Sequence, residues 1–187
     1  MNTILVSDVF GTTPALLNLG RELNAVEIID PYQGVEMNFK NETEAYSYFI
    51  KQVGFDSYLA KLLEVTKSTG SAVGLIGFSI GASTIWRLSE KRDISNVKKA
   101  VCFYGSQIRN YLSKPVNKIV PQFEIELVFP TSEPHFNVNQ LQTKLANIHN
   151  VQTRQVNGLH GFMNHYSDNY NQTAYEEQVE LLRLKFP

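Results

Sequence analysis

The chain has 187 residues, of which 43% are hydrophobic and 19% are charged, a composition typical of a soluble globular protein with a sizeable core. Its net charge of −1 gives no electrostatic reason to expect a nucleic acid or an anionic membrane as a partner. Cys102 is the only cysteine, which excludes an intrachain disulfide and a cysteine-based metal site. We expect one domain over residues 1–187.

The beginning of the chain does not resemble a targeting segment. It has no basic residues ahead of its first apolar stretch, and Asp8 interrupts that stretch, so a signal peptide is not expected. No apolar run reaches the length that crosses a bilayer. The sequence therefore predicts a cytoplasmic protein with no membrane partner.

Six short β-rich runs alternate with helix-periodic segments from end to end. Three of the runs are nearly all apolar, as expected for strands buried on both faces of a parallel sheet. In chain order, the predicted strands are 3–7, 25–29, 72–78, 100–104, 123–129 and 151–156.

The segments between these runs have the apolar spacing of amphipathic helices. The first helix is expected to begin at Pro14, with Thr13 as its N-cap. Apolar residues mark two further helices around 45–53 and 58–63, the second of which Gly70 can end. The remaining helices are expected from residue 80 to about 87 or 90, over 138–148, and over 175–186.

This alternation predicts an α/β fold with a mostly parallel, doubly wound six-stranded sheet and helices on both of its faces. Ligands of such folds bind at the carboxyl edge of the sheet. The tract 106–121 has little pattern, and we expect a loop or short helix there, at that edge.

The pentapeptide Gly77-Phe78-Ser79-Ile80-Gly81 fits the nucleophile-elbow pattern G-x-S-x-G. A predicted strand precedes it and a predicted helix follows, which is the context that the pattern requires. The glycines allow strand and helix to approach closely around a strained serine. The motif predicts Ser79 as a nucleophile; the alternative is a glycine-rich turn with an incidental serine.

A serine nucleophile needs a general base. The chain has four histidines: His135, His149, His160 and His165. His160 follows the last predicted strand and lies between Gly158 and Gly161, in a loop that can return a side chain over the sheet. In α/β-hydrolase order the base follows the last strand, so His160 is the predicted base and His165 the alternative.

The acid that orients this histidine should leave the preceding strand, 123–129. Glu133 is the only carboxylate in the loop after that strand, so it is the predicted acid. Asp168 is a second candidate, although it follows the histidine and breaks the usual order. Glu124 and Glu126 alternate with apolar residues and indicate a solvated strand face.

An oxyanion hole completes such a site with backbone N–H donors. One donor is expected at Ile80, directly after the nucleophile, and the other in the loop after the first strand. In that loop, Gly11 permits an unusual turn, and either Val9 or Phe10 can offer its amide.

Several segments, in this order, resemble the dienelactone hydrolase family of α/β-hydrolases: "ILVSDVFG", "IIDPY", "AVCFYG", "LHGF" and "AYEEQVELLRLKF". The resemblance implies a minimal, uncapped hydrolase of esters, lactones or related acyl compounds, with no metal or other cofactor. It puts the nucleophile at Ser79, the base at His160 and the acid at Glu133. The oxyanion amides then fall at Val9 and Ile80.

The chain departs from the family pattern at several positions. Ser79 stands where dienelactone hydrolase has a cysteine, and Glu133 stands where the acid is usually aspartate. Asp8 replaces a glutamate beside the oxyanion loop, as a possible accessory group. Met163 and Asn164 stand where an arginine grips the substrate carboxylate, which argues against an anionic dienelactone. The family's N-terminal hairpin is not matched, which predicts an exposed sheet edge and a monomer or homodimer.

The sequence thus predicts a hydrolase that cleaves an ester, lactone or thioester of a small molecule through a Ser79-His160-Glu133 triad and an acyl-enzyme. Aromatic side chains expected to line an apolar pocket above the sheet are Phe10, Tyr32, Tyr104 and Phe162. Two other functions use the same residues: a non-catalytic binding protein with the same fold, and an acyltransferase.

Overall fold

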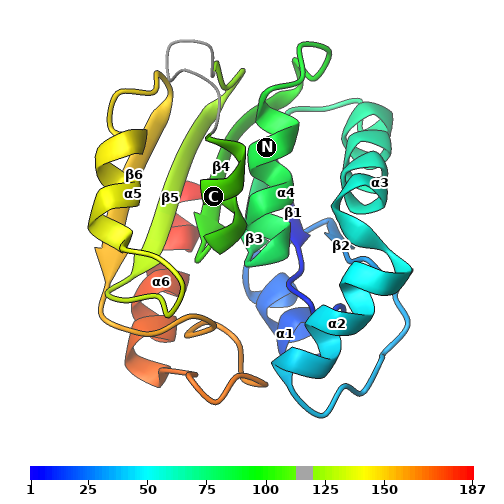
Figure 1. The fold of residues 1–187 in the computed structure, drawn as a ribbon. Coiled ribbons are helices and arrows are strands. Elements are labelled where there is room, and N and C mark those ends of the chain that lie inside the picture. The colour runs from blue at the N-terminus through cyan, green and yellow to red at the C-terminus, as the bar shows by residue number, and fades with distance from the viewer. Residues whose placement is uncertain (113–119) are drawn as a thin grey trace.

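Six parallel strands form a single sheet in the computed structural model, which describes residues 1–112 and 120–187 (Figure 1). The strands are β1 (Asn2–Val6), β2 (Glu27–Ile29), β3 (Val73–Phe78), β4 (Val97–Phe103), β5 (Glu124–Pro130) and β6 (Val151–Val156). Their order is β2-β1-β3-β4-β5-β6, and every neighbouring pair is parallel. The predicted α/β architecture is confirmed.

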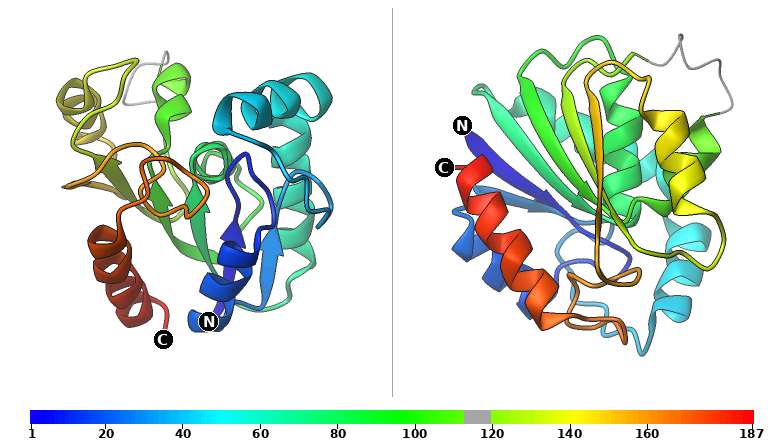
Figure 2. Two further views of the ribbon diagram at one scale, coloured as in Figure 1. Left: turned by 90° about the horizontal axis from the view of Figure 1, so that it is seen from below. Right: turned by 90° about the vertical axis from the view of Figure 1, so that its left-hand side faces the viewer.

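Helices cover both faces of the sheet. They are α1 (Pro14–Glu22), α2 (Glu42–Gln52), α3 (Gly54–Ser68), α4 (Ile80–Ser89), the 3₁₀ helix η1 (Ser106–Tyr111), α5 (Val138–Leu145) and α6 (Gln172–Lys185). Figure 2 shows α1 and α6 on one side of the sheet and the other helices on the opposite side. Among the described residues, no helix combines the length and the hydropathy needed to cross a membrane.

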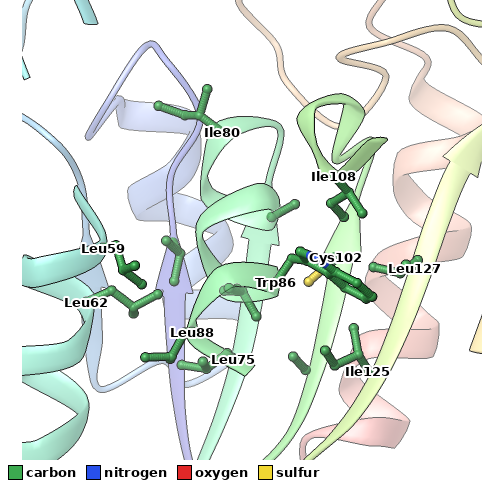
Figure 3. Packing of buried hydrophobic residues seen from close by; sticks show 14 of the residues in the cluster. Leu59, Leu62, Leu75, Ile80, Trp86, Leu88, Cys102, Ile108, Ile125 and Leu127 are labelled. Carbon is green, nitrogen blue, oxygen red and sulfur yellow. The ribbon is translucent and has the colours of Figure 1, made fainter. Parts of the chain in front are cut away.

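The period of two along the strands divides the core into two hydrophobic clusters, one on each face. In β1, Ile4 and Val6 belong to the cluster under α2 to α5, whereas Leu5 belongs to the cluster under α1 and α6. Figure 3 shows the larger cluster, in which Trp86 of α4 points toward Cys102 of β4. Burial raises the pKa of the Cys102 thiol well above its usual range, so this cysteine is unreactive core.

The structure corrects several predicted boundaries. The second strand is shorter than 25–29, because the Ala25 amide donates to the Gly20 carbonyl and so belongs to the turn after α1. The fourth strand begins earlier, at Val97, and α5 ends earlier, at Leu145. In the predicted tract 106–121, a short helix covers Ser106–Tyr111, and residues 113–119 lie outside the described residues.

The apolar residues predicted for the second helix form one face of α2, with a single exception. Ala45 and Phe49 are buried and Val53 packs against the core cluster, but Ile50 is 48% exposed. Tyr46 is partly buried, and it lines a cavity at the carboxyl edge of the sheet. Tyr46 therefore contacts the core cluster and also borders this cavity.

Candidate active site

Ser79 occupies a strained turn between β3 and α4, with φ 49° and ψ −109°. A side chain at Gly77 would place its Cβ 2.9 Å from the backbone nitrogen of Ala82, and one at Gly81 would place it 2.4 Å from the Val6 carbonyl oxygen. Both positions therefore require glycine, as the pattern predicts. The turn has the strand-to-helix geometry that raises a serine above the sheet.

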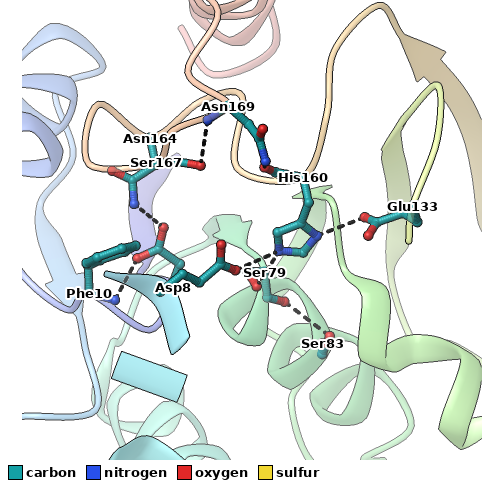
Figure 4. Close-up of polar contacts among 10 residues, drawn as sticks. Asp8, Phe10, Ser79, Ser83, Glu133, His160, Asn164, Ser167 and Asn169 are labelled. Carbon is teal, nitrogen blue, oxygen red and sulfur yellow. Dashed lines mark hydrogen bonds and ion pairs between the residues drawn. The ribbon is translucent and has the colours of Figure 1, made fainter. Parts of the chain in front are cut away.

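Two hydrogen bonds connect the three residues predicted as a triad (Figure 4). Ser79 Oγ lies 3.0 Å from His160 Nε2, and His160 Nδ1 lies 2.8 Å from Glu133 Oε1. The Glu133 side chain is only 3% exposed and that of His160 is 15% exposed. With Nδ1 donating to the carboxylate, a neutral His160 leaves Nε2 free to accept the Ser79 proton.

Contacts between loops hold His160 in place. The Asn169 side chain donates to the His160 carbonyl over 2.9 Å, and Gly161 takes a φ of 86°, which favours glycine. Thr131, close to Glu133 in the chain, donates from its amide to the Gly158 carbonyl over 3.2 Å. The loops after β5 and β6 are thus joined, so the acid and the base keep a fixed separation.

The pKa of His160 lies above its ordinary value. Burial of the ring disfavours the imidazolium and lowers the pKa, but the hydrogen bond and the charge of Glu133 outweigh burial. The charges of Glu42 and Asp8 raise the pKa further. Negative charge on both sides therefore stabilises the imidazolium that forms when Ser79 loses its proton.

The backbone amides of the loop after β1 differ in whether they are already hydrogen-bonded. Asp8 Oδ1 accepts from the Phe10 amide over 2.9 Å, and the Asp8 carbonyl accepts from the Gly11 amide over 3.2 Å. Among the described residues, none accepts a hydrogen bond from the amides of Val9 or Ile80. Of the two amides that the sequence left open in this loop, that of Phe10 is engaged and that of Val9 is free to bind an oxyanion.

Asp8 is a second partly buried carboxyl group at the site. Burial raises its pKa to about 6, and the charge of Glu42 adds to the rise. The hydrogen bonds from the Phe10 amide and the Asn164 side chain lower the pKa, as does the charge of His160. The Asn164 side chain donates a hydrogen bond to Asp8 Oδ2, and Asn164 lies where the family pattern has an arginine.

The four predicted pocket aromatics separate into two pairs. Phe10 and Tyr104 line a small cavity that also contains Ser79 and His160. Tyr32 and Phe162 line neither this cavity nor the larger one beside Ser79, which corrects the prediction for both. Phe162 is fully buried against Tyr104, at 5.4 Å between ring centroids, because its strand-end loop turns inward.

Tyr32 packs against the loop after β1 and holds it in position. Its hydroxyl donates to the Val9 carbonyl over 2.8 Å, and its ring occupies the space where a Gly11 side chain would lie. Tyr32 therefore supports the loop that carries the Val9 amide and does not face the cavity.

A cavity of about 660 Å³ opens beside Ser79, His160 and Glu133. Its far wall is α2, whose Glu42 and Tyr46 face the cavity. Glu42 Oε1 lies 3.5 Å from His160 Nε2. Sequence reasoning missed both residues, because an acid in the first turn of a helix and an aromatic one turn later are ordinary helix features.

The alternative site residues lie elsewhere. His165 is exposed and stacks on Tyr170 at 3.9 Å between ring centroids, and Asp168 is exposed. Glu126, expected on a solvated face, forms ion pairs with Arg154 and Lys185. Within residues 1–112 and 120–187, no group of three or more His, Cys, Asp or Glu side chains is arranged to hold a metal ion.

The parallel sheet in this order, with a strained serine after β3 and a histidine after β6, defines the α/β-hydrolase class of proteins. Within that class, the model of the dienelactone hydrolase family matches residues 25–184. The chain belongs to the dienelactone hydrolase family.

Comparisons with known proteins find a curated relative of similar length and solved structures with the same fold. The uncharacterized protein YczH of Bacillus subtilis (strain 168) is 27% identical over 188 residues, covering 96% of this chain and 89% of YczH. A dienelactone hydrolase candidate from Klebsiella pneumoniae aligns in structure with a TM-score of 0.72 and 17% identity, covering 98% of this chain and 85% of that one. A dienelactone hydrolase-like promiscuous phosphotriesterase from metagenomic libraries aligns with a TM-score of 0.70 and 16% identity, covering 100% and 87%.

Proposed function

We propose that this protein is a serine hydrolase that cleaves an ester, lactone or thioester of a small molecule. The observation that carries the proposal is the unbroken hydrogen-bonded series from Ser79 Oγ through His160 to Glu133, with steps of 3.0 Å and 2.8 Å. Membership of a hydrolase family supports it independently.

Each step of the reaction has a group in reach. Ser79 Oγ forms a bond to the acyl carbon while its proton passes to His160 Nε2, and Glu133 holds the imidazolium. The amides of Val9 and Ile80 stabilise the oxyanion. The bond to the leaving group then breaks as Nε2 returns the proton to it, and water repeats the sequence to release the acid and Ser79.

The test is turnover of short p-nitrophenyl esters by the wild type and by Ser79→Ala and His160→Ala. Loss of a nucleophile or base of this kind lowers turnover by about 10⁴-fold or more, because the reaction then relies on the oxyanion hole and binding alone. Circular dichroism shows whether each variant is folded. A folded wild type that cleaves no ester, or variants as active as the wild type, would contradict the proposal and favour a binding protein with a hydrolase fold.

A further inference from the structure

Glu42 presents a carboxylate to the cavity beside Ser79. Its side chain is 45% exposed, in the first turn of α2. Among the described residues, no lysine or arginine forms an ion pair with it, and His160 is the one ion-pair partner that it has there. The negative charge of Glu42 is therefore available to a bound molecule.

Tyr46 lies one turn further along α2 and lines the same cavity. Residues four apart on a helix are neighbours on its surface, so the carboxylate of Glu42 and the ring of Tyr46 belong to one patch of the cavity wall. A carboxylate and an aromatic face are the two side-chain groups that attract an organic cation.

The rest of the cavity does not counter this charge. Its described lining contains no lysine or arginine, and its other ionisable groups are Glu133, His135 and His160. Asp8 adds a further carboxyl group in the adjoining small cavity, which Glu42 also lines. A negatively charged substrate would be repelled here, whereas a positively charged one would be attracted.

The position of Glu42 identifies which part of a substrate it contacts. His160 Nε2 must lie within hydrogen-bond reach of the leaving group, because it returns the proton to that group. Glu42 Oε1 lies 3.5 Å from the same nitrogen. We therefore expect the leaving group to be the part of the substrate that contacts Glu42 and Tyr46.

We propose that the preferred substrates are esters or thioesters whose leaving group carries a positively charged amine close to the ester oxygen or sulfur, bound by Glu42 and Tyr46. This inference rests on the proposed hydrolase function and names the substrate class of the same site.

The test compares two thioesters of the same shape: acetylthiocholine, which is cationic, and S-(3,3-dimethylbutyl) thioacetate, in which carbon replaces the charged nitrogen. We expect wild-type kcat/KM to favour the cation by about tenfold, from one partly exposed ion pair and one cation–π contact. Glu42→Gln should reduce the ratio to about twofold or less, and Tyr46→Leu should reduce it in part.

Glu44→Gln is the matched control. Glu44 is an exposed carboxylate on the same helix, but it accepts a hydrogen bond from the Lys40 amide and does not line the cavity. Its variant should keep the wild-type ratio. A wild type that cleaves both thioesters equally, or a preference that survives Glu42→Gln, would overturn the inference and leave the hydrolase proposal intact.

A binding measurement keeps the cation site testable without turnover. Saturation transfer by NMR from the protein to the methyl groups of choline should be seen with the wild type and Glu44→Gln, and should be lost with Glu42→Gln. If no ester is cleaved, the hydrolase proposal fails, and choline binding still reports on the patch. Absence of transfer to the wild type would overturn the cation site.

Discussion

Each nitrogen of the His160 ring faces a carboxylate, and the two carboxylates differ in burial and in distance from the ring. On the Nδ1 side, Glu133 is almost completely buried and forms a 2.8 Å hydrogen bond. On the Nε2 side, Glu42 is 45% exposed and lies 3.5 Å away, in the wall of the cavity. A buried, hydrogen-bonded acid can fix the ring in one orientation, whereas an exposed one acts through its charge. The two positions therefore predict different kinds of defect.

The largest difference is expected in turnover. Glu133→Gln should lower kcat by about 10³-fold, because an amide can donate to Nδ1 and so favour the wrong tautomer of His160. Glu42→Gln should change kcat toward a neutral ester by less than about tenfold. Steady-state kinetics on one neutral p-nitrophenyl ester measures both. Equal losses in the two variants would remove the distinction between the two sides of the ring.

Asp8 extends the comparison to a partly buried carboxyl group that forms no ion pair within the part of the chain that the structure describes. Its folded pKa of about 6 lies above the ordinary value of 3.8, so the folded state holds more protons than the unfolded state between these two values. The resulting stability is present at low pH and is lost as the pH rises through about 6.

Asp8→Asn removes this titration. Relative to the variant, the wild type should gain on the order of 1–2 kcal/mol in the free energy of unfolding between pH 7 and pH 4. Urea unfolding of both proteins at several pH values measures the difference. A difference that does not change with pH would show that folding leaves the pKa of Asp8 unshifted.

The smallest effect concerns the acid limb of activity. The reaction needs neutral His160, whose pKa is raised, so kcat/KM toward a neutral ester should fall as the pH drops through a value above the ordinary 6.5. Removing the Glu42 charge lowers that pKa, so Glu42→Gln should move the limb to lower pH. A pH–rate profile of each protein measures the pH at which kcat/KM falls, with Glu44→Gln as the control. If that pH is the same in Glu42→Gln as in the wild type, Glu42 and His160 do not interact.

The same contrast explains how much of the site the sequence could predict. Ser79, Glu133 and His160 each follow a strand of the same parallel sheet, so strand order alone brings them to one edge. Glu42 reaches that edge only through the packing of α2 across the carboxyl ends, which no local pattern records.

The predicted helices and strands also agree with the structure where a regular sequence pattern defines them. Predictions based on strand alternation were confirmed within a few residues, and the apolar face of α2 was confirmed except at Ile50, which is exposed. Tyr32 and Phe162 were misplaced because an aromatic side chain near a loop can support the loop as readily as it can line a pocket. The oligomeric state, monomer or homodimer, stays a prediction.

Covalent labelling tests most directly whether Ser79 is an activated nucleophile. Incubation with a fluorophosphonate, followed by intact mass and peptide mapping, should give one adduct on Ser79 of the wild type and none on Ser79→Ala. A folded wild type that forms no adduct, or an adduct that maps to another residue, would contradict the account.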